Sequence, residues 1–373
     1  MLPVTFQQLT PHLAPFSRGI VKNLFLIAQA LVTSRSSNMN TVKDRLATLL
    51  GKANRQPASH YKRLIRFFNT SQPQQLTKAI LRCTFTLLSG RVRYLILDAT
   101  TWRLGQKDVH LLVLSFIYQG VAIPILWRDL DKKGHSNSHE RQSFMEEAAQ
   151  LYNLKGKILL ADREYTGKLW FTFLHQEGID FVIRIQRECY KHDTLTSYPT
   201  LERKAMRRKR PVWTWLNWAD CRLKLVMCRN EDPRPPKDPR KRAEPVFYWL
   251  TSLENAQVVP AHYRKRWRIE QCFKALKTNG FHLESMNFKQ STKIELLLAV
   301  VVFAYVLSVK AGEAVSDQIG TKTYQNGTSS PAQSLFKKGL EVLNATLLVF
   351  DQFMGYLLCI FKLAKPRRFC FVQ

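Results

Sequence analysis

Two aspartates stand at the ends of short apolar runs. Asp98 follows Tyr94-Leu-Ile-Leu, and Asp162 follows Lys157-Ile-Leu-Leu-Ala. Desolvating a carboxylate in such a place is costly unless something neutralises its charge. A divalent metal ion shared by both side chains would neutralise them and would also create a site for phosphate chemistry. Either aspartate alone could instead cap the turn that follows it.

A third acidic residue, Glu270, lies in a segment with helical periodicity. At about 100° per residue, it shares roughly 60° of the helix circumference with Tyr263, Arg266 and Lys277. An apolar stripe beside this face could pack on a sheet; it consists of Ile269, Cys272, Phe273 and Leu276. The face thus offers a carboxylate for a metal ion, beside two cations and a phenol suited to phosphate. The alternative is a surface helix in which Glu270 pairs with Lys274.

The elements that must position these residues have the order of an α/β domain. Strand-like runs cover 94–98, 109–118 and 121–127. A helix at 138–152, a strand at 157–161, a helix at 167–176 and a strand at 181–185 follow. Three strands followed by alternating helices and strands predict an RNase H-like domain, a mixed sheet flanked by helices. In that order the strands that precede Asp98 and Asp162 are neighbours.

The composition changes after the last of these strands. We interpret 187–245 as a β-rich insertion before the helix that bears Glu270, with a strand at 246–253 returning to the main domain. Residues 203–210 hold six basic residues in eight, and we expect Arg207 and Arg208 to contact DNA. A solvated loop is the alternative. Trp213, Trp215 and Trp218 follow in one short stretch, and a small aromatic core would explain them as well as an exposed role would.

Both ends of the chain are predicted to be helical. A helix that starts at Thr41 and a second that Ser59 caps are separated by a Gly/Pro turn, as in a helix-turn-helix. The second helix carries Lys62, Arg63 and Arg66, which makes it the candidate for DNA contact, although any small helical bundle would show the same periodicity. A linker is expected over 70–75 and an amphipathic helix near 335–361.

The overall charge narrows the class of partner. Fifty-seven Lys and Arg against 28 Asp and Glu give a net charge of +29, which favours a polyanion such as nucleic acid. The most apolar run, 296–309, is shorter than the roughly 20 residues of a membrane-spanning helix and predicts a core helix. Seven scattered cysteines form no C-x-x-C pair, and no signal peptide is evident, so a reducing cytoplasm is expected.

These motifs together resemble those of insertion-sequence family 4 transposases. Tyr263, Arg266, Glu270 and Lys277 match the Y-(2)-R-(3)-E-(6)-K signature of that family at all three spacings. Three further stretches are similar over roughly 90–310. They are Asp98-Ala-Thr-Thr-Trp102 with Gly105 and Lys107, Leu126-Trp127 with Lys132-Lys-Gly-His-Ser-Asn137, and Asp162-Arg-Glu164.

The resemblance implies a DNA transposase on an RNase H-like fold. By analogy, Asp98, Asp162 and Glu270 would bind two Mg²⁺ ions, for which Mn²⁺ could substitute. Arg266 and Lys277 would hold phosphates at the element's end, and Tyr263 would contact the complementary strand's 5′ phosphate. Relatives with such an insertion stack a flipped base on a Trp, for which Trp213, Trp215 and Trp218 are candidates.

The same resemblance implies double-stranded DNA as partner, both as terminal inverted repeats and as target, and a homodimer in the synaptic complex. It also implies a bacterial, nucleoid-associated enzyme. We expect a helical DNA-binding domain over 1–88, a catalytic domain over 89–310 and a helical segment over 311–373. An RNase H-like nuclease or resolvase without strand transfer, and a catalytically inactive DNA-binding derivative, are the competing interpretations.

Overall fold

The computed structural model describes residues 10–50, 57–88, 90–105, 107–132, 134–187, 198–218, 221–231, 233, 244–325 and 327–363. Its contacts divide the chain into two compact units. Unit 1 comprises 1–91, 100–111 and 271–369, and unit 2 comprises 92–99, 112–270 and 370–373. The predicted domain boundaries at 88 and 310 stay predictions.

An eight-stranded mixed sheet has the order β3-β2-β1-β4-β5-β8-β7-β6. β1 pairs with β4 and β4 with β5 in parallel, whereas β5–β8, β8–β7 and β7–β6 are antiparallel. The strands are β1 (Tyr94–Leu104), β2 (Lys107–Tyr118), β3 (Val121–Asp129), β4 (Ile158–Ala161), β5 (Asp180–Ile185), β6 (Val212–Trp218), β7 (Cys221–Arg229) and β8 (Val246–Thr251). All four residues of β4 are buried, as expected for a strand covered on both faces.

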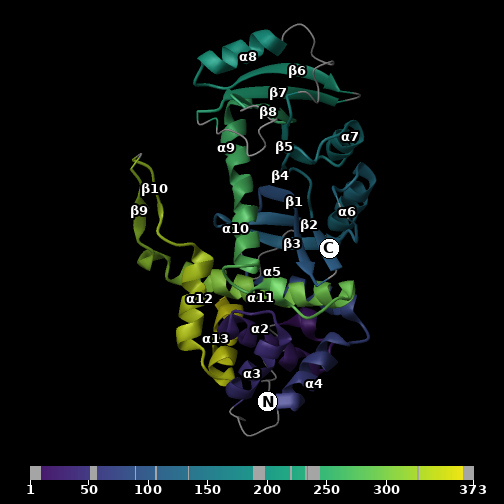
Figure 1. Cartoon of the computed structure of the whole chain (residues 1–373), viewed down its shortest axis with the longest axis vertical. Helices are drawn as coiled ribbons and strands as arrows, with labels where there is room; N and C mark the ends of the chain where they lie inside the picture. Colours follow the sequence, from purple (N-terminus) through teal and green to yellow (C-terminus); the bar gives the residue numbers. More distant parts are fainter. Residues whose placement is uncertain are drawn as a thin grey trace. The chain divides into compact units, whose positions relative to one another are not determined.

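Helices cover the sheet within unit 2. They are α6 (Ser138–Leu151), α7 (Lys168–Gln176), α8 (Tyr198–Arg207) and α9 (Val259–Tyr263). Figure 1 shows α6 and α7 along one side of the sheet and α9 along the other. α6 begins with a capping box in which Asn137 and Glu140 each bond the other's backbone N–H. The order β1-β2-β3-α6-β4-α7-β5 confirms the predicted RNase H-like fold.

One strand prediction needs correction. β1 does not end at Asp98 but continues to Leu104, because Thr100, Thr101 and Trp102 are good strand formers. The structure also shows where the strands of the predicted insertion pair. β6 and β7 are joined to β5 through β8 and so extend the same sheet, a pairing between residues far apart in sequence.

Unit 1 contains two sets of helices. The N-terminal set is α2 (Arg18–Ser34), α3 (Met39–Leu49), α4 (Pro57–Phe68) and α5 (Pro73–Thr86), with the 3-10 turn η1 (Pro11–Leu13) before it. The C-terminal set is α11 (Ser291–Ala314), α12 (Leu335–Thr346) and α13 (Phe350–Leu363), with η4 (Leu283–Ser285), η5 (Ser316–Gln318), β9 (Thr321–Thr323) and β10 (Ser329–Pro331). α11 packs on α2, α5 and α12.

The predicted helix starts in the N-terminal set are shifted. α3 begins at Met39, capped by Asn38, rather than at Thr41. α4 begins at Pro57 rather than after Ser59, because proline's fixed φ suits the first turn of a helix. The predicted turn between them, 51–56, lies outside the described residues. The linker expected over 70–75 ends where α5 starts, at Pro73.

The apolar run at 296–309 is part of a longer helix than predicted. α11 has 24 residues and is long and apolar enough to cross a membrane by length and composition, but 89% of its most apolar window is buried inside the protein. A soluble protein's core helix passes the same test. The burial favours that core interpretation, as the sequence predicted.

α11 and α12 approach each other unusually closely at two glycines. A Cβ added to Gly312 would lie 1.9 Å from the carbonyl oxygen of Leu335, and one added to Gly339 would lie 1.7 Å from that of Ser308. Backbone oxygens cannot yield by that much, so only glycine fits at either position. The two helices therefore pack backbone against backbone at these two positions.

Candidate active site

The strand register places Asp98 beside Asp162. The last paired residues of β1 and β4 are Leu97 and Ala161. Asp98 is the next residue of β1, and Asp162 directly follows the end of β4. Each carboxylate also accepts a bond from the following backbone N–H, that of Ala99 at 2.9 Å and that of Arg163 at 2.8 Å. Parallel pairing thus brings together two residues separated by more than sixty positions.

Asp98 lies in an environment that disfavours its charge. Burial raises its pKa to about 6 from an ordinary 3.8. Arg266 and the backbone N–H of Ala99 act in the opposite direction, while the charges of Asp162 and Glu164 raise the pKa further. A carboxylate so close to other carboxylates needs a cation to stay ionised near neutral pH.

Arg266 supplies that cation. Its guanidinium donates to the Oδ2 of Asp98 at 2.9 Å and to the Oε1 of Glu270 at 2.7 Å. The side chain is only 12% exposed. Burial acts to lower the pKa of Arg266, but Tyr263 and the three carboxylates outweigh it and raise the pKa. One buried guanidinium therefore bridges two of the three predicted metal ligands.

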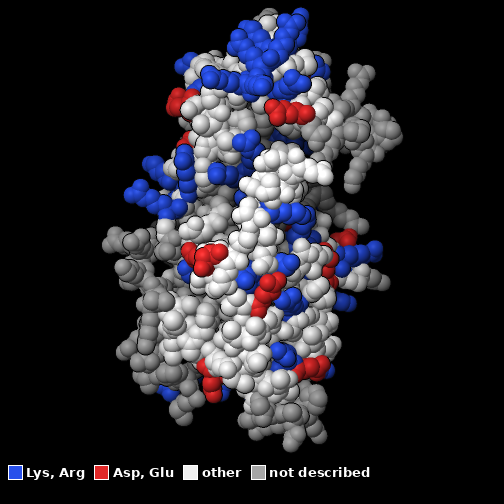
Figure 2. Space-filling model, turned by 90° about the vertical axis from the view of Figure 1, so that its left-hand side faces the viewer, with Lys and Arg blue, Asp and Glu red and all other residues white. Residues whose placement is uncertain are grey.

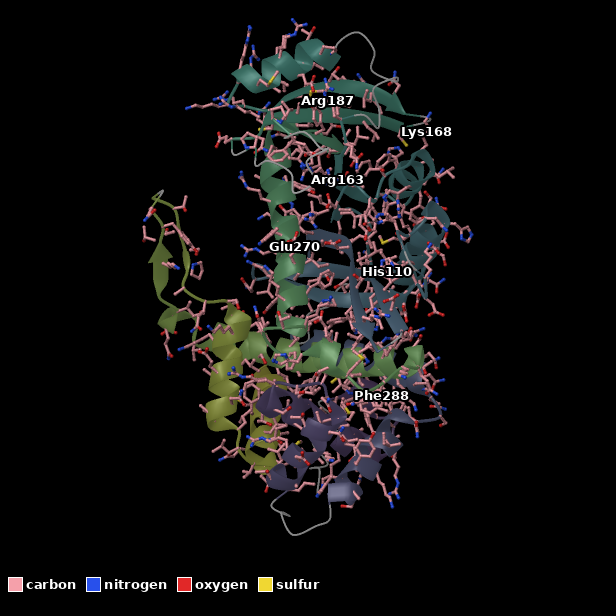
Figure 3. The ribbon with its side chains drawn as sticks, viewed as in Figure 1. His110, Arg163, Lys168, Arg187, Glu270 and Phe288 are labelled. Atoms are coloured by element: carbon pink, nitrogen blue, oxygen red, sulfur yellow. The ribbon has the colours of Figure 1, made fainter. Side chains whose placement is uncertain are left out.

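Tyr263 contacts the remaining carboxylate. Its hydroxyl donates to the Oδ1 of Asp162 at 3.3 Å, and its ring lies 5.8 Å from that of Trp249 on β8. Burial and the charge of Asp162 raise the pKa of Tyr263, so the phenol stays protonated and acts as a donor. Tyr263 and Arg266 contact the two aspartates from one segment of chain, and Glu270 of the same segment is joined to Asp98 through Arg266 (Figure 3 labels Glu270).

That segment is not one ideal helix. The 3-10 turn η3 (Arg264–Arg266) separates α9 from α10 (Trp267–Leu276), and η2 (Ala256–Val258) precedes α9. The predicted single face of about 60° therefore holds only in part, because a 3-10 turn rotates side chains by more than 100° per residue. The step from Arg266 to Glu270 keeps helical i,i+4 spacing, which is why their side chains meet.

Lys277 follows the end of α10 and belongs to unit 1. Its ammonium donates to the carbonyl oxygen of Thr101 at 2.6 Å, pairs with Glu284 at 3.4 Å and lies 5.2 Å from the ring centroid of Trp102. Burial lowers the pKa of Lys277 and the nearby Glu284 opposes the shift. Lys277 and these three partners lie within the same unit.

The donor chemistry suits a hard divalent cation, since Asp98, Asp162 and Glu270 offer only carboxylate oxygens. Their arrangement is not that of an assembled metal site. Within the described ranges, no group of three or more His, Cys, Asp and Glu side chains is placed to hold a metal ion. The guanidinium of Arg266 is bound between two of the carboxylates instead, so a metal ion would have to replace it there.

Sequence reasoning missed how two loops near the aspartates are joined. His135, in the loop after β3, pairs through Nδ1 with Glu164 at 2.8 Å. The buried Arg141 donates to the hydroxyl and carbonyl oxygens of Ser136 and to the carbonyl oxygen of Thr166. The residues of the Lys132–Asn137 motif were visible in the sequence, but only the packing of α6 brings the two loops together. Lys133 of that motif lies outside the described residues.

The candidate stacking residues on β6 are exposed. Trp213 and Trp215 are 40% and 36% exposed and form a T-shaped pair with 5.7 Å between ring centroids. Arg222 lies 4.1 Å and Lys224 4.2 Å from the ring centroid of Trp215. The expected alternative, a small aromatic core, does not fit these two residues. The side chain of Trp218 lies outside the described residues.

The candidate DNA-contacting residues are on the surface of both units. Lys62 and Arg66 are exposed on α4, and Arg63 is half-buried. Arg207 at the end of α8 and Arg208 just beyond it are exposed. Figure 2 shows a dense patch of Lys and Arg over the part of unit 2 where Figure 1 draws α8. The two sets lie in different units.

The chain is similar to a transposase of known structure and to a family of transposase domains. A cryo-EM structure of a piggyBac transposase synaptic complex with hairpin DNA is similar, with a TM-score of 0.48 and 10% sequence identity. The match covers 95% of this chain and 77% of that chain. None of the curated proteins compared with the chain matches it. The transposase DDE domain family matches residues 92–307, which include all three carboxylates and are more than half of the chain. The chain belongs to the transposase DDE domain family.

Proposed function

We propose that this protein is the DNA transposase of an insertion sequence. It binds the element's terminal inverted repeats, cuts at the ends and joins the 3′ ends to target DNA. The observation that carries the proposal is that Arg266 joins Asp98 to Glu270, with Asp162 held beside Asp98 by the strand register, within a DDE domain. The narrower assignment to insertion-sequence family 4 rests on the Tyr263, Arg266, Glu270 and Lys277 spacing.

In this proposal the three carboxylates hold two Mg²⁺ ions. The ions would activate a water or a 3′-hydroxyl for in-line attack and stabilise the leaving 3′ oxygen. The protein's own part is to hold Asp98 and Asp162 side by side where the pairing of β1 with β4 ends, and to carry Glu270 on the helix that follows Arg266. The pKa of Asp98 is raised although Arg266 lies beside it, and the higher charge of a divalent ion would keep this carboxylate fully ionised.

Arg266 would then change partners. A guanidinium that leaves two carboxylates is well suited to a phosphodiester, which offers the same pair of oxygens. DNA phosphate and metal ion together would replace the two contacts that Arg266 makes in the free protein. Tyr263 would donate to a phosphate of the complementary strand, and Lys277 would hold a second phosphate.

The strands β6 and β7 would meet unpaired or distorted DNA. Trp213 and Trp215 are exposed, and the exposed Arg222 lies over the ring of Trp215. Aromatic rings beside such a cation stack on bases in single-stranded DNA. The exposed basic end of α8 would hold the backbone nearby. Second-strand cleavage through a hairpin would use such a stacking site.

Synapsis of two element ends calls for a homodimer in the active complex, in the bacterial cytoplasm where the chromosome lies. α4, with Lys62, Arg63 and Arg66, is our candidate for reading the inverted repeats. Contact with the DNA backbone there would add to the salt-dependent part of binding.

A strand-transfer assay tests the function. The purified chain, Mg²⁺ and a pre-cut oligonucleotide from the DNA flanking its reading frame should yield products joined to a plasmid. Asp98→Ala, Asp162→Ala and Glu270→Ala should each abolish them, and Asp317→Ala, in the other unit, should not. Cleavage without joined product would favour a nuclease or resolvase, and DNA binding without either reaction an inactive derivative.

A further inference from the structure

A two-stranded hairpin in unit 1 has no part in the site described above. β9 and β10 pair in antiparallel register from Thr321–Pro331 to Thr323–Ser329. The turn is closed by the backbone N–H of Tyr324 to Thr328 at 2.8 Å and that of Gly327 to Tyr324 at 2.9 Å. Figure 1 draws the hairpin as an arm that projects from the end of α12.

The arm buries none of its described side chains. All three residues of β9 are exposed, and β10 has only Ser330 at intermediate exposure. An isolated two-stranded hairpin is only marginally stable in water. Its base is anchored, however, because α11 and α12, which flank it in the chain, pack closely together at Gly312 and Gly339. A well-anchored arm without a core of its own is suited to meeting a partner.

The chemistry of the arm favours DNA as that partner. No acidic residue occurs between Asp317 and Glu341, while Lys322, Lys337 and Lys338 are basic. Hydroxyl and amide side chains fill the rest of the hairpin, and these bond to phosphates and base edges. A second copy of the chain would need an apolar patch, which Thr, Ser, Lys and Gln do not provide.

Two side chains at the turn are arranged for such contact. Tyr324 is 46% exposed, and its hydroxyl lies 3.1 Å from that of Ser330 across the hairpin. The ammonium of Lys322 lies 5.5 Å from the Tyr324 ring centroid. A ring fixed by its neighbours from both strands, with a cation beside it, presents a flat face and a positive charge together.

We propose that the β9–β10 arm enters a groove of the element's terminal DNA and contacts it through Lys322 and Tyr324. The major groove admits a two-stranded ribbon, and proteins of other folds read DNA in this way. The proposal rests on the transposase function and adds a further DNA contact, on a unit that contains none of the three carboxylates.

The test compares DNA binding by the full chain and by two arm variants. One variant is Lys322→Ala with Tyr324→Ala, and the other replaces 322–330 by a short Gly-Ser turn. Lys289→Ala removes the same charge from another exposed position of the same unit and serves as the control. Probes are a labelled duplex from the DNA flanking the reading frame and an unrelated duplex of equal length.

We expect both arm variants to bind the terminal duplex about tenfold more weakly, as the loss of a groove contact does. For Lys322→Ala/Tyr324→Ala, the slope of the logarithm of the DNA-binding constant against the logarithm of the salt concentration should become shallower by about 0.9, which corresponds to one lost phosphate contact. A discrete stretch of hydroxyl-radical protection should vanish in both. Melting temperatures should not change, because the arm buries no described side chain.

Unchanged affinity and footprint in both arm variants would overturn the proposal while leaving the transposase function intact. A change in oligomeric state without DNA, measured by light scattering, would also overturn it and assign the arm to a second copy. If the wild-type chain binds neither duplex, the proposed function itself fails, and the arm proposal with it.

Discussion

At the scale of residues, the contacts of Arg266 are those that would differ most between the free protein and the metal-bound form that we propose. It binds Asp98 and Glu270, which the proposed function assigns to metal ions. Two positive groups cannot hold the same oxygens without mutual repulsion. Arg266 therefore stabilises the free protein, and in the proposed function a metal ion would have to displace it from the carboxylates.

We predict that Arg266→Ala binds Mn²⁺ more tightly than the wild type in the absence of DNA, on the order of tenfold, because a charge-assisted hydrogen bond contributes about 1.5–3 kcal/mol. Isothermal titration calorimetry measures this directly. Arg264→Ala, two residues away and exposed, is the matched control and should leave the affinity unchanged. Weaker Mn²⁺ binding by Arg266→Ala would show that the arginine supports the metal site rather than competing for it.

The raised pKa of Asp98 predicts that the stability of the protein depends on pH. Burial raises its pKa from 3.8 to about 6, so the folded state binds this proton more tightly than the unfolded chain. The stabilisation is therefore present below pH 3.8 and is lost as the pH rises towards 6. A shift of about 2 units corresponds to about 3 kcal/mol. Asp98→Asn should avoid this loss.

Urea denaturation in EDTA checks that expectation. Asp98→Asn should be more stable than the wild type above pH 6, with the difference shrinking towards pH 3.8. A variant that is less stable than the wild type at neutral pH would mean that the ion pair with Arg266 outweighs the burial of the charge.

At the scale of elements, the close packing of α11 against α12 predicts that one added methyl group there lowers the stability of the protein. Gly339→Ala places a Cβ 1.7 Å from a backbone oxygen, and such overpacking typically costs about 1–3 kcal/mol or more. Gly355→Ala, on α13, is the matched control, because nothing lies within 4 Å of its added Cβ and alanine favours a helix by up to about 1 kcal/mol. In thermal melting, Gly339→Ala should lower the melting temperature and Gly355→Ala should raise it.

The sheet shows how far elements could be predicted. The alternation of apolar runs and turns indicated β1 to β5 and their helices, because each depends on local periodicity. It could not indicate that β6 and β7 extend the same sheet through β8, since pairing between distant strands is a tertiary matter. For the same reason it could not distinguish exposed Trp213 and Trp215 from an aromatic core.

At the scale of the whole molecule, a net charge of +29 is the dominant property. Such a charge attracts any DNA and makes binding steeply dependent on salt. The charge cannot by itself select the DNA ends that the proposed function requires. Selection must come from interactions with base edges, and the basic groups contribute mainly to general affinity.

We therefore predict that Arg207→Gln/Arg208→Gln weakens binding to terminal and unrelated duplexes equally. The slope of affinity against salt should fall by up to about 0.9 for each DNA phosphate that the variant no longer neutralises. Lys155→Gln, an exposed lysine of the same unit, tests whether charge alone explains the change. Anisotropy titrations over a range of salt measure it, and weaker binding confined to the terminal duplex would contradict a backbone role.

The sequence by itself determined the RNase H-like order of elements, the three carboxylates and the family signature around Glu270. Each follows from local periodicity or from fixed spacing along the chain. The spacing from Arg266 to Glu270 survives in the structure because four residues make about one helical turn.

Only the tertiary structure decided which groups those residues touch. Asp98 and Asp162 meet because parallel strands align Leu97 with Ala161. Arg266 reaches Asp98 across 168 positions, and the 3-10 turn before α10 alters the face on which it was expected. Such interactions depend on strand register and burial, which no pattern along the chain specifies.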